Sequence, residues 1–323
     1  MEKCLITGGA GFIGSHLVEA CIEKGWRVLV IDDLSTGKKE NLPRSQDRLE
    51  FIQGDIRDRQ FLRNIMTLNP DVDYVFHLAA IASVIRSMED PVLTHDVNYR
   101  GTLFLLECLR ARTIKKFVYA SSAAVYGDTQ ILPLKEEFPP KPQSPYGADK
   151  LAGEYILKIY NDSFQVPTVA CRFFNVFGER QDPSSPYSGV ISIFFDKAFG
   201  GKGGEDRFIT IFGDGRQTRD FVYVKDVVSA LLHLAQDEDT GGEVFNIGYG
   251  NRMSILDLAS KVKALTDDSL ETVFEKGRAG ELRHSQADIS KLKKTGFQFF
   301  YDFDRGLKRL AQWIEPQESH PDE

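Results

Sequence analysis

Cysteine is scarce in this sequence of 323 residues, which contains only Cys4, Cys21, Cys108 and Cys171. Each of them lies in an apolar segment typical of a strand or a helix, and no two form a CxxC pair. We therefore expect buried, reduced thiols rather than a disulfide framework.

Metal-ligand clusters and long apolar runs are missing as well. His77, His95 and His284 have no partner at the spacing of metal ligands, so no metal site is expected. No run approaches the ~18 apolar residues that a membrane-spanning helix requires. Met1 leads directly into a strand, which leaves no room for a secretory signal. These absences predict a cytoplasmic protein without a membrane partner.

Neither sign of charge forms a long block. Forty Lys and Arg residues against 47 Asp and Glu residues give a net charge of −7. A nucleic-acid partner would require a basic patch or stripe, which the sequence does not show. We therefore expect no nucleic-acid partner.

Apolar runs of strand length alternate with segments of helical period in the first half of the chain. The runs are continuously apolar, as they are when helices cover both faces of a parallel sheet. The pattern predicts an α/β fold with a doubly wound parallel sheet. We expect strands at 4–7, 27–31, 51–53, 74–77, 116–121 and 168–172, and helices at 12–24, 61–68, 91–112 and 146–163.

The pattern loosens after residue 172. A loop is expected at 179–188, a helix near 190–199 and a hairpin at 200–204, followed by short strands and helices. The tail from residue 314 onward is rich in Pro, Ser, Glu and Asp and is expected to fray.

Gly8, Gly11 and Gly14 lie in the turn between the first strand and the first helix. Missing side chains there let backbone N–H groups and a helix N-terminus approach a pyrophosphate. Taken alone, the glycines also fit a tight turn without a ligand. Asp32 closes the second strand, where a carboxylate accepts the hydroxyls of an adenosine ribose. Together these features predict a Rossmann-type site for a dinucleotide.

The charge of Asp32 favours NAD over NADP, because a carboxylate repels a 2′-phosphate. Lys38 and Lys39 follow closely and leave NADP open as an alternative. Asp55 and Ile56 follow the third strand, where they either face the adenine or form an ordinary turn.

Tyr146 and Lys150 occur in the segment Tyr-Gly-Ala-Asp-Lys at the start of a helix. Their spacing places the phenol and the ammonium side by side on one helix face. The ordinary pKa of a phenol is ~10, and it must fall by roughly 3 units for the group to act as a base at neutral pH. Lys150 and a cationic nicotinamide are expected to lower the pKa of Tyr146.

With these motifs the chain resembles the extended short-chain dehydrogenase/reductase family, and within it the UDP-sugar 4-epimerases related to UDP-galactose 4-epimerase. The likeness covers nearly the whole chain. The matching segments are Thr7 to His16, Asp32 to Gly37, Gly54 to Asp58, His77 to Ala80, Ala120 to Gly127, Tyr146 to Lys150, Arg172 to Gly178 and Phe208 to Val227.

The resemblance implies roles for three residues, Ser122, Tyr146 and Lys150. Tyr146 would take the O4 proton of the sugar while C4 passes a hydride to NAD, Ser122 would hydrogen-bond O4, and Lys150 would hold the nicotinamide ribose. The 4-keto sugar would then turn its other face and receive the hydride and proton back, which regenerates NAD.

The resemblance also implies a division of the chain. Residues 1–172 would bind NAD, with a strand and helix returning from the C-terminal half, and residues 173–313 would mainly bind the nucleotide sugar. The cofactor-binding residues implied are Gly8, Gly11, Phe12, Ile13, Gly14, Asp32, Ser35, Thr36, Gly37, Asp55, Ile56, Leu78, Ala79, Ala80, Asn98, Tyr146 and Lys150.

Ala123 and Ala124 follow Ser122, where related 4,6-dehydratases and decarboxylases carry an acidic residue. A methyl group offers neither an acid nor a base, so epimerisation is favoured over those reactions. An NAD-binding protein without catalytic activity remains an alternative, because fold alone does not establish function.

Asn175, Arg219 and Arg278 match family positions that contact the substrate diphosphate, which guanidinium groups suit geometrically. Without the family match, either arginine reads as a surface charge. The remaining substrate-binding residues implied are Ser83, Ser122, Val190, Thr210, Phe212, Glu281 and Ser285.

Ser285 aligns with a gate that is tyrosine in epimerases restricted to glucose and galactose. A small residue leaves room for a 2-N-acetyl group, so UDP-GlcNAc and UDP-GalNAc are expected substrates beside UDP-Glc and UDP-Gal. A UDP-glucuronate 4-epimerase is the nearest alternative. Relatives dimerise through two helices of each subunit, here 92–112 and 146–163, which implies a homodimer.

Overall fold

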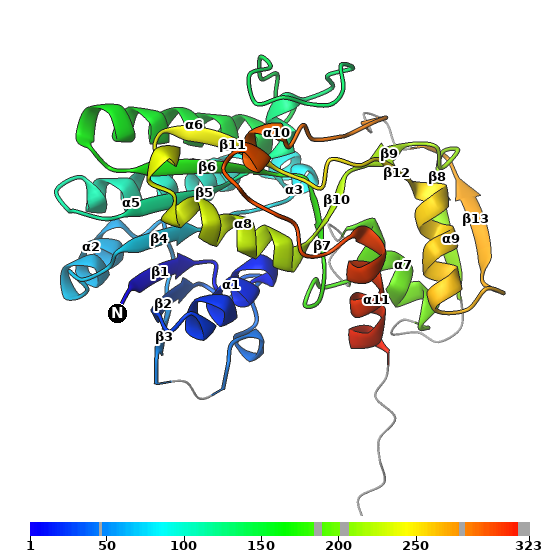
Figure 1. Cartoon of the computed structure of the whole chain (residues 1–323), viewed down its shortest axis with the longest axis horizontal. Helices are drawn as coiled ribbons and strands as arrows, with labels where there is room; N and C mark the ends of the chain where they lie inside the picture. The colour runs from blue at the N-terminus through cyan, green and yellow to red at the C-terminus, as the bar shows by residue number, and fades with distance from the viewer. Residues whose placement is uncertain (45–46, 184–188, 201–206, 278–281, 316–323) are drawn as a thin grey trace, which may run out of the picture.

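A parallel sheet forms the larger part of the structure, a computed structural model that describes residues 1–44, 47–183, 189–200, 207–277 and 282–315 (Figure 1). Its strand order is β11-β6-β5-β4-β1-β2-β3, with every neighbouring pair parallel. The strands are β1 (Lys3–Thr7), β2 (Arg27–Asp32), β3 (Leu49–Gln53), β4 (Tyr74–His77), β5 (Lys116–Ser122), β6 (Thr168–Phe173) and β11 (Glu243–Ile247).

Successive residues of the central strands face opposite layers, which explains why these strands are continuously apolar. Cys4 and Ile6 pack with α1 and α8, whereas Leu5 packs with α2, α5 and α6. The predicted doubly wound sheet is confirmed. The helices are α1 (Phe12–Glu23), α2 (Arg59–Leu68), α3 (Val84–Glu89), α4 (Pro91–His95), α5 (Thr102–Leu109), α6 (Pro145–Phe164), α7 (Val190–Ala198), α8 (Val224–Gln236), α9 (Ile255–Leu265), α10 (Ser290–Lys294) and α11 (Phe303–Ile314).

The single helix predicted at 91–112 is wrong in one respect, because a π-helical turn at Asp96–Gly101 separates α4 from α5. Thr102 donates its hydroxyl proton to the carbonyl of Asn98 at 2.6 Å. The Asn98 side chain in turn bonds both the N–H and the carbonyl of Ile81, at 2.8 and 3.1 Å. The wide turn directs this amide at the segment that follows β4, as π-turns often do near functional sites.

The C-terminal part of the chain builds three short strand pairs around a second core. Phe177, Phe194 and Leu258 are among the buried residues of that core. The helices α7, α9 and α11 contribute residues to this core. Figure 1 shows these helices beside the parallel sheet. The pairs are β7 (Asn175–Phe177) with β10 (Phe221–Tyr223), β8 (Phe208–Phe212) with β13 (Glu271–Glu275), and β9 (Thr218–Arg219) with β12 (Met253–Ser254).

Two predictions for this part need comment. The tail was expected to fray from residue 314, but α11 includes Ile314, and residues 316–323 lie outside the described chain. Residues 201–204 of the predicted hairpin also lie outside it. None of the described helices has the length and apolar character needed to cross a bilayer.

Candidate active site

Ser122, Tyr146 and Lys150 converge where β5 ends and α6 begins. Ser144 caps α6 by accepting the N–H of Gly147 at 3.1 Å, and Pro145 occupies the first turn, where its fixed φ suits a helix start. Tyr146 therefore lies in the first turn of α6, and Lys150 lies one turn further on. Ser122 lies close enough to Tyr146 to lower the pKa of the phenol. The Lys150 Nζ lies 5.9 Å from the centroid of the Tyr146 ring.

Burial works against the charged form of both reactive groups. It raises the pKa of the Tyr146 phenol, and the hydrogen bond with Ser122 opposes this rise. Burial also lowers the pKa of Lys150 to about 7, against the effect of the carboxylates of Asp149 and Glu154. The lowered pKa expected for Tyr146 is thus not produced by the protein alone. A bound nicotinamide ring would bring a positive charge that favours the phenolate.

The glycine turn brings the backbone of β1 against that of β4. Gly8 has a φ of +71°, and a Cβ there would lie 2.7 Å from the backbone nitrogen of Ala79. A Cβ at Gly14 would lie 2.1 Å from the carbonyl oxygen of Gly8. In the described chain no side chain caps the first turn of α1 and no acidic residue lies in it. Its N–H groups and helix dipole therefore suit the pyrophosphate of a dinucleotide.

Asp32 lies at the end of β2, beside this turn. Its carboxylate accepts the N–H of Ala10 and the N–H of Leu34, both at 2.9 Å. Each oxygen retains acceptor capacity for a ribose hydroxyl. Burial raises the pKa of this carboxyl group, while the two backbone N–H groups lower it.

The loop after Asp32, which contains Ser35, Thr36 and Gly37, folds back over the carboxylate. A Cβ at Gly37 would lie 2.8 Å from Oδ1 of Asp32. The two lysines that left NADP open have other partners. Lys38 pairs with Asp182 at 2.9 Å, and Lys39 lies 5.2 Å from the ring centroid of Phe51.

The remaining predicted cofactor residues lie along the carboxyl edge of the sheet. Leu78 donates its N–H to the carbonyl of Thr7 at 3.1 Å, which holds residues 78–80 against the glycine turn. Ile56 is buried after β3, and the carboxylate of Asp55 is bound by the Arg57 guanidinium, which holds its pKa below the usual range. The prediction that Asp55 and Ile56 face the adenine remains untested. Phe12 and Ile13 begin α1.

Several predicted substrate residues meet in the C-terminal part. Asn175 is exposed on β7 and donates its backbone N–H to the carbonyl of Asp220 at 3.0 Å. Arg219 is the last residue of β9 and directly precedes Asp220. Ser285 donates its N–H to the carbonyl of Thr218 at 3.1 Å. The three residues are therefore linked through the Thr218–Asp220 segment.

The other predicted substrate residues are more scattered. Thr210 and Phe212 share the half-buried face of β8, and Val190 begins α7. Ser83 caps α3 by accepting the N–H of Arg86 at 3.1 Å. Arg278 and Glu281 lie outside the described residues.

Sequence reasoning missed Asp220, which is fully buried. Its carboxylate accepts the N–H groups of Tyr249, Gly250 and Ala287 at 2.8, 2.9 and 2.9 Å. Burial nevertheless raises its pKa to about 6. The three donors lie 29 or more positions away in the sequence, so no local pattern identifies this residue.

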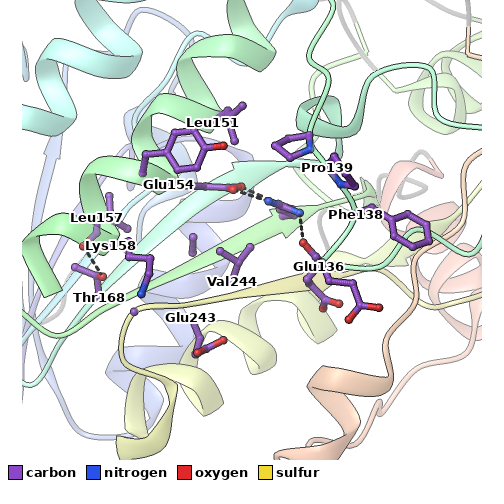
Figure 2. Close-up of a pocket in the computed structure, with 16 residues that line it drawn as sticks. Glu136, Phe138, Pro139, Leu151, Glu154, Leu157, Lys158, Thr168, Glu243 and Val244 are labelled. Atoms are coloured by element: carbon purple, nitrogen blue, oxygen red, sulfur yellow. Dashed lines mark hydrogen bonds and ion pairs between the residues drawn. The ribbon is translucent and has the colours of Figure 1, made fainter. Parts of the chain in front are cut away.

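Two cavities of the described chain lie outside this set of residues. One of about 240 Å³ is bounded by α6, β6, β11 and residues 136–140. Its wall includes Glu154, which Figure 2 labels, and the partner of Glu154 in a buried ion pair, Arg172. The other, of about 570 Å³, lies between residues 38–44 and 180–183. Ser122, Tyr146 and Lys150 line neither of these two cavities.

Comparison with known proteins identifies the family. Residues 4–248 match the model of the NAD dependent epimerase/dehydratase family. A putative UDP-glucose 4-epimerase of Methanocaldococcus jannaschii is 41% identical over 312 residues, which cover 96% of this chain and 98% of that protein.

Solved structures agree with this assignment. The UDP-N-acetylglucosamine 4-epimerase of Methanobrevibacter ruminantium, in complex with UDP-N-acetylmuramic acid, superposes with a TM-score of 0.90 at 38% identity, covering 97% of each chain. The UDP-glucose 4-epimerase of Thermus thermophilus, in complex with NAD, has a TM-score of 0.87 at 35% identity, covering 96% of this chain and 98% of that one. The predicted fold and the predicted cofactor, NAD, are confirmed. This chain belongs to the NAD dependent epimerase/dehydratase family.

Proposed function

We propose that the protein inverts the C4 hydroxyl of a UDP-hexose, with NAD as a cofactor that is regenerated in each turnover. The observation that supports this most directly is the convergence of Ser122, Tyr146 and Lys150 at the end of β5 and the start of α6. Residues 1–172 would hold the dinucleotide, and residues 173–313 would mainly hold the nucleotide sugar.

Tyr146 is the base in this proposal, and Ser122 positions the sugar. Ser122 lies beside Tyr146, so a sugar O4 that reaches both has an acceptor for its proton and a second hydrogen-bond partner. Lys150 provides a positive charge that favours the phenolate. NAD, when bound, takes the hydride from C4 and returns it to the opposite face of the 4-keto sugar.

The residues that follow Ser122 support epimerisation over elimination or decarboxylation. Ala123 and Ala124 begin a short 3₁₀ turn, and the N–H of Ala124 is donated to the Ser122 hydroxyl at 3.2 Å. Two methyl groups therefore stand where a further acid or base would act. Inversion then depends on the keto sugar turning over while its nucleotide is held, a role suited to Asn175 and Arg219.

The small side chain of Ser285 supports N-acetylated substrates. Ser285 is buried beside the Thr218–Asp220 segment, which also carries Arg219. A serine there leaves space that a tyrosine would fill. We therefore propose UDP-GlcNAc and UDP-GalNAc as substrates in addition to UDP-Glc and UDP-Gal.

The test is to incubate the purified protein separately with UDP-Glc, UDP-GlcNAc and UDP-glucuronate, without added reductant, and to resolve the products by chromatography. Interconversion of the C4 epimers is expected for the first two sugars. Turnover of UDP-glucuronate alone would favour the uronate epimerase, and loss of water or CO₂ would show another reaction of the fold. No product from any sugar would indicate a catalytically silent protein.

Tyr146→Phe removes the proton acceptor while keeping the ring, and we expect it to abolish conversion of every sugar. Tyr301→Phe is the control, because Tyr301 lies in the C-terminal part just before α11, where its ring contacts Tyr223 and Arg305. It should leave turnover unchanged. Nearly intact turnover in Tyr146→Phe would contradict the proposed role.

We also propose that two copies of the chain form a homodimer. Large apolar side chains are exposed on α3, α4 and α6, and these helices contact one another. The predicted segments 92–112 and 146–163 both contribute to this surface, and α3 adds to it. Light scattering of the purified protein should give twice the chain mass of 36.4 kDa. The exposed apolar residues of this surface are Val84, Ile85, Met88, Val92, Tyr155 and Ile159.

The cytoplasmic location of the protein remains a prediction.

A further inference from the structure

Asp149 is a buried carboxylate that directly precedes Lys150 in α6. The residue is only 6% exposed. Its Oδ1 atom bonds Nδ1 of His95 on α4 at 2.8 Å, and the His95 side chain is 50% exposed. The second oxygen, Oδ2, is buried and accepts no hydrogen bond from any described residue. A buried carboxylate that is only half satisfied is costly, so its retention calls for an explanation.

The other carboxylate near Lys150 is neutralised. Glu154 lies one turn beyond Lys150, and both of its oxygens are bound by the Arg172 guanidinium, at 2.9 and 2.7 Å. Both side chains of this pair are almost fully buried. Arginine always carries its charge, so the pair contributes little net field. Asp149 is bound instead by a histidine.

The remaining groups around Lys150 do not compensate for the cost of burying it. Its Nζ donates to the carbonyl of Ala120 at 2.8 Å and lies 4.9 Å from the centroid of the Tyr119 ring. Burial lowers the pKa of Lys150 to about 7, and Asp149 is the main group that opposes this. The groups facing Lys150 are thus Tyr146, Asp149 and Glu154 of α6, His77 of β4, Tyr119 of β5, Arg172 of β6 through Glu154, and His95 of α4 through Asp149.

We propose that Asp149, held in place by His95, is a positioning residue whose negative charge keeps the side chain of Lys150 protonated in the working enzyme. This inference rests on the proposed function, in which the ammonium of Lys150 favours the Tyr146 phenolate. In this proposal Asp149 acts through Lys150 and takes no proton from the sugar. Without it, Lys150 loses its proton at a lower pH, and the base loses its supporting charge.

The test is Asp149→Asn, which removes the charge but retains an oxygen that can accept from His95. The alkaline limb of the kcat profile is expected to move to lower pH by about one unit, the size of effect that one nearby charge has in a protein interior. KM should change little. Asp162→Asn is the matched control, because Asp162 lies exposed on the same helix, paired with Lys158. It should leave the limb in place.

A second measurement does not depend on turnover. The Lys150 side chain is titrated by NMR in protein carrying isotope-labelled lysine, with its signal assigned by comparison with Lys150→Arg. A titration displaced to lower pH in Asp149→Asn supports the proposal, and an unchanged or higher midpoint overturns it. If the parent protein converts no sugar, the proposed function fails, while this titration still decides the role of Asp149. Asp149→Ser, which also removes the charge, replaces Asp149→Asn if that variant does not fold.

Discussion

The parallel sheet and the C-terminal part of the site hold their functional groups in different ways. In the sheet, the glycine turn, Asp32 and residues 78–80 follow adjacent strands, so main-chain pairing sets their spacing. In the C-terminal part, Asn175 and Arg219 lie on strands of two or three residues, and Ser285 lies outside the named strands. Strand pairs as short as these contribute few hydrogen bonds, so they do little by themselves to hold these residues in place.

The difference shows what each part depends on. A substitution in the sheet acts through backbone packing at the place where it is made. In the C-terminal part, the buried carboxylate of Asp220 bonds segments around residues 249–250 and 287, so one side chain holds several distant segments together. We therefore expect a steric clash to be the most damaging change at the edge of the sheet. In the C-terminal part we expect it to be the loss of a single buried polar group.

The largest effect is expected from Gly14→Ala. A Cβ at this position would lie 2.1 Å from the carbonyl oxygen of Gly8, so the glycine turn has to move. We expect NAD binding and activity to fall below detection, with a loss of about 1–3 kcal/mol in the free energy of unfolding, as for other overpacked sites. Calorimetric titration with NAD and thermal unfolding would measure both.

Gly25→Ala is the control for that experiment. Gly25 has a φ of +80° at the other end of α1, so alanine is strained there without a clash in the glycine turn. It should lower stability while leaving NAD affinity unchanged. Equal loss of NAD affinity in both variants would show that general destabilisation, rather than the turn, controls binding.

An intermediate effect is expected from Asp220→Asn. An amide offers one acceptor oxygen to three N–H groups that now share a carboxylate, so we expect a loss of about 2–3 kcal/mol in the free energy of unfolding. The KM for the nucleotide sugar should rise, while NAD affinity stays unchanged. Denaturant unfolding and steady-state kinetics test this, and a parallel fall in NAD affinity would contradict the separation of the two parts.

The same residue predicts a pH dependence. The pKa of Asp220 is about 6 in the folded protein, above the usual value of ~4 for an aspartate. The folded state therefore binds this proton more tightly than the unfolded state does. Its contribution to stability is present below pH ~4 and is lost as the pH rises to about 6. Asp220→Asn should lack this slope when unfolding is measured across that range.

The smallest overall effect is expected from Ser285→Tyr. The larger side chain should reduce conversion of UDP-GlcNAc by at least about tenfold. A steric conflict that raises the activation free energy by about 1.4 kcal/mol has that effect on a rate. Conversion of UDP-Glc should change by only a few fold. Comparing the two sugars by chromatography tests the gate, with Ser285→Ala as the control. Equal losses for both sugars would contradict a role in selectivity.

The sequence predicted the location of those candidate residues whose place depends on local backbone geometry. The glycine turn, Asp32 and the Tyr146–Lys150 spacing are local patterns, and the structure places them at the sheet edge as their periodicity predicts. Asp220 was missed because its partners are distant in sequence. Asp149 was visible within the Tyr146–Lys150 segment, but only the fold brings His95 to it.

The direction of the Tyr146 pKa was also beyond local reasoning. The sequence shows a lysine near the phenol but does not show how completely both groups are buried. Burial raises the pKa of the phenol and lowers that of the lysine, which reverses the expected result for the protein alone. Desolvation depends on the whole fold, so the neighbouring charge by itself gave the wrong direction.

The π-helical turn at Asp96–Gly101 has a consequence for α5, the helix that follows it. Such a turn holds one residue more than an α-helical turn, so every residue after it is rotated by about 100° relative to a regular helix. The position of the Asn98 amide therefore depends on how many residues the segment 96–101 contains as well as on which residues they are. Deleting one residue from 96–101 would therefore present a different set of side chains from α5 to the rest of the fold.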